Sequence, residues 1–386
     1  MKEVKWATMI PLIGGSALGC KEATGKLPEF HLSYEPFESN EKHLIEYWPN
    51  VERVNLSENK APEVSLDFIN SVCPCAGLSQ LNTSKNKEAK DNQNAWMMRS
   101  SKLILENMKP RVLWGENAPG LFTNSGKHVR DQLNEIAQQN GYSFSIYKTS
   151  TFKHGIPQKR LRTFYFFWDS PTAPILNWYE KPYTPFVDYI QKIPEGASQQ
   201  DSLNLYDIEE KYPSYTFLLN KYQLTHSKFI EEFGNGPAHS VHQFIVRNDL
   251  IDECLDWLEV NRPDHKEIKK FNHIKNKLSM GKSFLDHSPA FYYDCTNAIV
   301  GRTLMMLMHP IEFRGLSHRE IIHMMGMPHD FELKSKHLNH LAQNVPTSTA
   351  KDMTTEVLKY LNGELKDSGF ESFKQDNIKK INLTWS

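Results

Sequence analysis

The sequence predicts an α/β fold: a mixed, mostly parallel sheet covered by helices, with a smaller irregular lobe. Three observations lead to this prediction. Strand-like apolar runs alternate with segments of helical spacing over the first 170 residues. From about residue 175 to 300 the periodicity is poor and Tyr, Pro, Asn and Lys are frequent, and helical patterns return after residue 305. Alternation of strands and helices is typical of a parallel sheet with helices on both faces, which binds ligands at the carboxyl ends of its strands.

Each expected element follows from a local pattern. Apolar and aromatic runs predict strands at 9–13, 30–35, 66–72, 111–117, 143–149 and 162–168. Helical spacing predicts helices at 41–48, 95–108, 128–141 and 347–363. Ser317 and Glu320 have the spacing of a capping box and predict a further helix start. The tail at 370–386 fits no pattern.

Composition limits the class of protein. The net charge of −1 over 386 residues gives no overall attraction to nucleic acid, so such binding would need a local basic surface. No run of 18 apolar residues is present, and the short apolar run after the first lysines fits a core strand better than a signal peptide. Five scattered cysteines fit free thiols in a reducing compartment, so a cytoplasmic location is expected.

The segment Cys73-Pro74-Cys75 follows a predicted strand and offers two thiols. It fits a nucleophile on a tight loop, but also two small core cysteines. A metal pair is disfavoured because no second cysteine or histidine pair lies at ligand spacing. The pairs formed by His239 with His242 and by His337 with His340 lack a neighbouring carboxylate or cysteine in the sequence, so we expect no metal site.

Two further groups follow predicted strands. Glu116 ends the strand at 111–117, where a carboxylate can face the ligand crevice and give or hold a proton, although a helix cap is an alternative. Arg160 and Arg162 alternate at a strand start and so are expected to point to one side. Two guanidinium groups there suit a phosphate or a planar base edge, although surface salt bridges are an alternative.

The order of these motifs resembles the DNA cytosine-5 methyltransferase family. A Gly-rich turn, Pro-Cys, Glu-Asn and Gln-x-Arg-x-Arg follow one another, and RGLSHREIIHMMGMPHDFEL and LAQNVPTSTA resemble two later family motifs. The resemblance covers about 6–170 and 305–362. It implies a Rossmann-like domain that depends on S-adenosyl-methionine.

Residue roles follow from the resemblance. It implies that Cys75 is the nucleophile, that Glu116 engages the N3 edge of cytosine, and that Arg162 with Arg160 holds the base carbonyl and its phosphate. Expected cofactor-binding residues are Ile13, Gly14, Gly15, Glu35, Pro74, Asn344 and Val345. Expected substrate-binding residues are Ser79, Asn117, Gln158, Lys269 and Lys270.

The resemblance also implies a substrate and a division of the chain. We expect catalytic segments at 1–172 and 305–386 and a target-recognition lobe at 173–304, which contains the only dense basic stretch. The expected partner is double-stranded DNA with a flipped-out cytosine, bound by a monomer in a bacterial or phage-infected cell. The polar segment at 79–95 is expected to be a loop that closes over the DNA.

The cofactor loop departs from the family pattern. The family's Asp-Leu-Phe-Ala-Gly is replaced by Thr8, Met9, Ile10, Pro11 and Leu12, and Asn55 stands where an acidic residue is expected. Two alternatives therefore accompany the DNA enzyme: a tRNA cytosine-5 methyltransferase with the same motif order, and a catalytically weak paralogue that binds nucleic acid.

Overall fold

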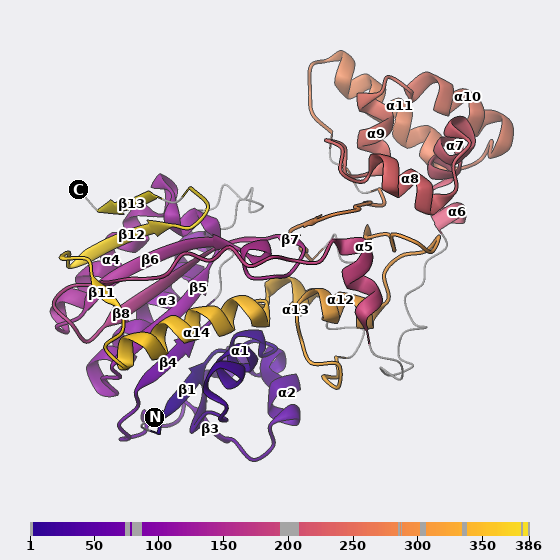
Figure 1. The fold of residues 1–386 in the computed structure, drawn as a ribbon. Coiled ribbons are helices and arrows are strands. Elements are labelled where there is room, and N and C mark those ends of the chain that lie inside the picture. The colour runs from indigo at the N-terminus through magenta and orange to yellow at the C-terminus, as the bar shows by residue number, and fades with distance from the viewer. Residues whose placement is uncertain are drawn as a thin grey trace.

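A nine-stranded sheet forms the centre of the larger part of the molecule (Figure 1). The computed structural model describes residues 3–73, 78, 87–193, 208–284, 286, 288–301, 306–333, 338–379 and 381–384. In spatial order the strands are β13 (Ile381–Thr384), β12 (Ser372–Asp376), β6 (Ser143–Ser150), β8 (Leu161–Trp168), β5 (Val112–Asn117), β4 (Phe68–Ser71), β1 (Trp6–Met9), β2 (Phe30–Ser33) and β3 (Glu52–Asn55).

The sheet is mixed but mostly parallel, as the sequence predicts. Strands β3, β2, β1, β4 and β5 run parallel, and so do β6 and β12. Only β8, between β5 and β6, and the edge strand β13 run antiparallel to their neighbours. The carboxyl ends of β1, β2, β4, β5 and β6 therefore share one edge of the sheet, where ligands bind in such folds.

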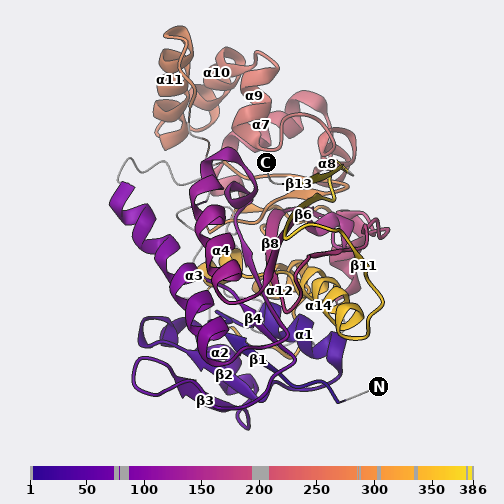
Figure 2. The same cartoon turned by 90° about the vertical axis from the view of Figure 1, so that its left-hand side faces the viewer.

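Helices cover both faces of this sheet (Figure 2). On one face α1 (Gly15–Thr24) packs against α14 (Thr347–Leu361), and on the other α3 (Lys87–Asn107) lies beside α4 (Lys127–Gln139). Gly19 allows the first contact, because a Cβ there would lie 2.6 Å from the Ala350 Cβ. The predicted helix at 347–363 therefore packs against the helix that follows the first strand.

The inserted lobe is helical, which corrects the expectation of an irregular lobe. Its helices are α6 (Ile208–Lys211), α7 (Pro213–Tyr222), α8 (His226–Phe233), α9 (Val241–Arg247), α10 (Ile251–Asn261) and α11 (Lys266–Ser279). They enclose a separate apolar cluster in which Phe229 contacts Phe244 and Phe291. The helices are short, and their shared core joins residues that are distant in the sequence.

Several other elements differ from the sequence predictions. β1 ends at Met9, so residues 10–13 form a turn and not a strand. β3 was not among the predicted strands, and α3 begins at Lys87, so 87–95 is helical and not part of a loop. The tail without a pattern supplies β12 and β13, and the two-residue strand β11 (Lys366–Asp367) precedes it.

Two predictions about composition can be compared with the described part of the chain. Within it, no helix combines the length and the apolar character needed to cross a membrane. Cys20, Cys73, Cys254 and Cys295 are buried free thiols, as expected from the cysteine count.

Candidate active site

Two neighbouring parallel strands bring the predicted catalytic motifs to one edge of the sheet. β4 leads into Cys73, and β5 carries Glu116 near its carboxyl end. Pro74, Cys75 and Ser79 lie outside the residues that the structure describes. After β4 the structure describes the chain as far as Cys73 and again at Leu78.

Cys73 follows β4 and is held by buried hydroxyl groups. Its side chain is 1% exposed, and Sγ lies 3.3 Å from Ser71 Oγ and 3.1 Å from Ser100 Oγ of α3. Burial raises the pKa of the Cys73 thiol, which these hydroxyl groups only partly oppose. A buried thiol with a raised pKa is a poor nucleophile.

Glu116 and Arg162 form a nearly buried ion pair. Arg162 Nε lies 2.6 Å from Glu116 Oε1, and Glu116 is 1% exposed. Burial raises the pKa of Glu116, although the positive charges of Arg162 and Arg160 oppose this change. The site therefore holds a proton on this carboxyl group to higher pH than water does.

Arg160 is held by backbone carbonyl groups, whereas Arg162 pairs with Glu116. It precedes β8, is fully buried, and its guanidinium group donates to backbone carbonyl oxygens. Nη1 lies 2.8 Å from Ile299 O, and Nη2 lies 2.7 Å from Ala342 O and 2.9 Å from Asn344 O. Arg160 thus ties three distant segments together beside Glu116.

Gln158 and Asn117 also contact protein groups. Gln158 is fully buried in β7 (Gln158–Lys159), where Nε2 donates to Met324 O at 3.2 Å and Oε1 accepts from Ile299 N at 3.3 Å. Asn117 is fully buried, and its Oδ1 accepts from Ala118 N at 2.9 Å. Both side chains therefore position the backbone around the site.

Sequence reasoning missed Tyr165, whose ring packs against Gly115, directly before Glu116. A Cβ at Gly115 would lie 2.3 Å from the Tyr165 ring and hydroxyl group, so only glycine leaves room for this ring. The Tyr165 hydroxyl group lies close to the side chains of Ser71 and Cys73. Burial raises the pKa of this hydroxyl group well above its usual value. A glycine inside an apolar strand, directly before Glu116, was the available signal.

The turn between β1 and α1 holds the residues expected to bind the cofactor. Gly14 has φ +106°, which favours glycine, and the Gly15 N–H donates to Asn344 Oδ1 at 2.8 Å. A Cβ at Gly15 would lie 2.1 Å from Val345 O. Gly14, Gly15, Asn344 and Val345 therefore meet at this turn, with the buried Ile13 between the elements.

The chemistry of this edge fits S-adenosyl-methionine in part. Asn70 Oδ1 and Thr8 Oγ1, opposite each other on β4 and β1, are buried without a hydrogen-bond partner among the described residues. Glu35 follows β2 and is solvent-exposed, so its carboxylate is available for hydroxyl groups. These groups fit a polar ligand at the glycine turn.

The departures from the family pattern are visible in the same turn. Ile10 has φ +48° and Leu12 has φ +55°, and both side chains are buried. Non-glycine residues in this region are strained, by about 1 kcal/mol each. Asn55 accepts from Ser57 N at 2.9 Å and so stabilises its own turn.

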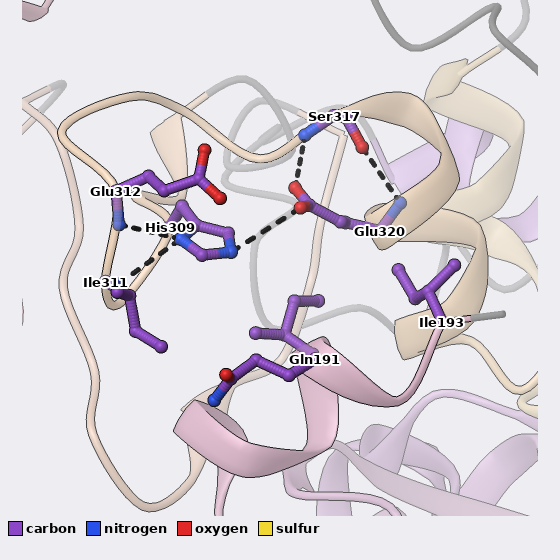
Figure 3. Close-up of a pocket in the computed structure, with 8 residues that line it drawn as sticks. Gln191, Ile193, His309, Ile311, Glu312, Ser317 and Glu320 are labelled. Atoms are coloured by element: carbon purple, nitrogen blue, oxygen red, sulfur yellow. Dashed lines mark hydrogen bonds and ion pairs between the residues drawn. The ribbon is translucent and has the colours of Figure 1, made fainter. Parts of the chain in front are cut away.

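A pocket of about 410 Å³ lies away from these residues, between η6 (Ile190–Lys192) and the start of α12 (His318–Met324) (Figure 3). Its wall includes the predicted capping box, which is present: Ser317 Oγ accepts from Glu320 N, and Glu320 Oε2 accepts from Ser317 N. His309 Nδ1 accepts from the backbone N–H of Glu312 at 2.9 Å. Arg314 pairs with both Glu312 and Glu320 of this pocket, which contains none of the predicted site residues.

The lobe carries the other predicted substrate-binding residues. Lys269 is exposed on α11, whereas Lys270 is half-buried and its pKa is lowered by burial. His242 is fully buried, with Nε2 2.6 Å from Glu267 Oε1 and Nδ1 3.4 Å from Asp286 Oδ1. It is therefore a buried histidine held between two carboxylates, which come from distant parts of the sequence and so were not visible as neighbours there.

Comparison with known proteins decides the family. The family model described as C-5 cytosine-specific DNA methylase matches residues 10–361. This chain belongs to the C-5 cytosine-specific DNA methylase family. Membership in this DNA methylase family makes the chain a methyltransferase of the cytosine-5 class and implies the use of S-adenosyl-methionine. No curated protein sequence matches it.

Solved structures share the fold of this chain. One is described as a DNA modification methyltransferase encoded within an E. coli prophage (16% identity, 93% of this chain and 99% of that chain covered, TM-score 0.57). Others are the Entamoeba histolytica methyltransferase EhMeth (12% identity, 94% and 99% covered, TM-score 0.57) and Spodoptera frugiperda DNMT2 (11% identity, 92% and 99% covered, TM-score 0.51). At these identities the similarity establishes the fold alone.

Proposed function

We propose that this protein transfers a methyl group to C5 of a cytosine in a specific sequence of double-stranded DNA, with Cys75 as the covalent nucleophile. The observation that carries the proposal is the buried pair of Glu116 and Arg162 at the carboxyl end of β5. It lies beside β4, whose chain continues directly into Pro74 and Cys75. A proton-holding carboxyl group next to a nucleophile loop matches what the reaction requires.

The chemistry assigns a role to each residue. The Cys75 thiolate adds to C6 and breaks the aromaticity of the ring, so that C5 becomes nucleophilic. Glu116 holds a proton at N3, which accepts the electron density that the thiolate introduces. After C5 gains the methyl group, a water molecule takes the C5 proton, the C5–C6 double bond forms again and the Cys75–C6 bond breaks to return the thiolate. Arg162 orients the Glu116 carboxyl group, and Arg160 and Gln158 position the surrounding backbone.

The methyl donor would lie at the β1–α1 turn. S-adenosyl-methionine supplies an electrophilic methyl group when it is bound. Gly14, Gly15 and Asn344 would shape its binding turn, and the Glu35 carboxylate would accept hydrogen bonds from ribose hydroxyl groups. The strained Ile10 and Leu12 would line the same turn, so they affect donor affinity.

We assign 1–172 and 305–386 to catalysis and 173–304 to target recognition by a monomer. In a duplex the stack hides C5 and C6, so the cytosine must be flipped out. The long lobe between the two catalytic segments favours DNA over tRNA, and the lysines of α11 are candidates for phosphate contact. Lys269 is exposed and available for phosphate contact.

The test is methyl transfer from labelled S-adenosyl-methionine to duplex DNA and, separately, to tRNA. Label in DNA is expected, and label in tRNA alone would replace DNA by tRNA as the substrate. No label in either polymer would identify a catalytically weak nucleic-acid-binding protein. Cys75→Ser should abolish transfer, and Cys73→Ser, two residues earlier, is the matched control that should keep it.

A further inference from the structure

Tyr165 of β8 carries a fully buried hydroxyl group next to the strand end that leads to Cys75. The hydroxyl oxygen has no hydrogen-bond partner among the described residues, although the side chains of Ser71 and Cys73 lie close to it. An unpaired buried hydroxyl group lowers the stability of a folded protein. A phenylalanine ring would fill the same space without this cost, so the hydroxyl group calls for a role outside packing.

The pairing of three strands brings this ring to the end of β4. Ser71 of β4 lies opposite Gly115 of β5, and Gly115 lies opposite Tyr165. Paired residues point to the same face of a sheet and successive residues alternate, so these three share one face and Glu116 points to the other. A Cβ at Gly115 would lie 2.3 Å from the Tyr165 hydroxyl oxygen and 2.6 Å from the backbone oxygen of Ser71. The strand glycine therefore lets the hydroxyl group reach the end of β4.

The neighbouring side chains form a chain of hydrogen bonds with a defined direction. Ser100 Oγ donates to Met97 O at 3.2 Å, so it accepts from the Cys73 thiol at 3.1 Å. Cys73 Sγ then accepts from the Ser71 hydroxyl group at 3.3 Å. The Ser71 hydroxyl oxygen thus remains as an acceptor, and the Tyr165 hydroxyl group is a donor close to it.

We propose that Tyr165 is a positioning residue for methyl transfer: in the DNA complex its hydroxyl group donates to Ser71 Oγ and so fixes the end of β4, from which the chain continues to Cys75. This inference rests on the proposed function. Attack on C6 needs the Cys75 sulfur about 3.5 Å from that carbon, and a misplacement of about 1 Å lowers such a rate roughly a hundredfold. A group that costs stability in the free protein is expected where activity uses it.

The test replaces Tyr165 by Phe in the full chain and measures methyl transfer to duplex DNA together with urea unfolding. Tyr165→Phe removes only the hydroxyl group, so the unfolding midpoint should stay the same or rise, whereas kcat should fall by about tenfold or more. The KM for DNA, the affinity for S-adenosyl-methionine and the shape of the pH–rate profile should stay unchanged, because this hydroxyl group contacts neither substrate and transfers no proton.

Tyr147→Phe is the matched control. Tyr147 of β6 is also a fully buried tyrosine, but its hydroxyl group donates to Asn177 O at 3.0 Å. Its removal leaves a carbonyl oxygen without this donor, so the unfolding midpoint should fall while kcat stays unchanged. The two variants therefore differ by the same atom and are expected to respond in opposite ways.

The outcomes separate this inference from the proposed function. A wild-type protein that methylates DNA, with the same kcat in Tyr165→Phe, would overturn the role of Tyr165 alone. A lower unfolding midpoint in Tyr165→Phe would also overturn it, because the hydroxyl group would then be a structural donor in the free protein. A wild-type protein that transfers no methyl group to DNA would overturn the proposed function and this inference together.

Discussion

Replacing Arg160 tests whether its side chain holds the protein backbone in place or contacts the substrate. Arg160→Gln removes the guanidinium donors of three buried hydrogen bonds, to Ile299 O, Ala342 O and Asn344 O. Each hydrogen bond from a charged group contributes roughly 1.5–3 kcal/mol, and a carbonyl left buried costs about 1–3 kcal/mol. With partial relaxation we expect the free energy of unfolding to fall by about 4 kcal/mol, within the range for a broken buried charge network.

The assay is urea unfolding followed by the fluorescence of the buried tryptophans Trp114 and Trp168. Lys159→Gln is the matched control: it removes the same charge one position earlier from an exposed side chain and should change stability by less than about 0.5 kcal/mol. Arg160→Gln should keep its turnover per folded molecule within about tenfold. An Arg160→Gln protein as stable as wild type but inactive would refute this reasoning and restore Arg160 as a substrate clamp.

Three further predictions follow from the site. Burial raises the pKa of Glu116 in the folded state, so the wild-type protein loses stability relative to a neutral variant as pH rises through that pKa. The stability of Glu116→Gln minus that of wild type should therefore increase between pH 4 and 8 in urea titrations. The same variant should lose at least a hundredfold in turnover. A difference that shrinks with pH would contradict this. Gly115→Ala should lose about 1–3 kcal/mol of stability through the clash with Tyr165, seen as a lower melting temperature, and an unchanged melting temperature would oppose the packing described. Asn344→Ala should lower the free energy of unfolding by about 1–3 kcal/mol and weaken S-adenosyl-methionine binding in calorimetry, because it leaves the Gly15 N–H unpaired. Asn344→Asp keeps an acceptor oxygen and should lose less stability. Equal affinities in wild type and both variants would argue against the turn as the methyl-donor site.

The sequence predicts the sheet and most of its helices because local patterns dominate there. Apolar runs and caps mark β4, β5 and α12 clearly, and the motif order identifies the family. The lobe is misjudged because its short helices depend on aromatic packing between distant residues. The tail is missed because β12 exists only through its pairing with β6.

The same limit applies to the site. Glu116 is placed at the correct strand end because a carboxylate after an apolar run is a local signal. Alternation along a strand predicts one side for Arg160 and Arg162, and the charges of both act on Glu116, but the carbonyl partners of Arg160 could not be predicted because they lie far away in sequence. Tyr165 is missed because its role depends on the absence of a side chain at Gly115.

The most direct test of the central claim is a covalent trap with duplex DNA that contains 5-fluorocytosine. Fluorine at C5 cannot leave as a proton does, so the Cys75–C6 bond should persist. With S-adenosyl-methionine present, wild type and Cys73→Ser should form a denaturation-resistant complex with the DNA, and Cys75→Ser should form none. A complex that survives in Cys75→Ser and is lost in Cys73→Ser would contradict the assignment of the nucleophile.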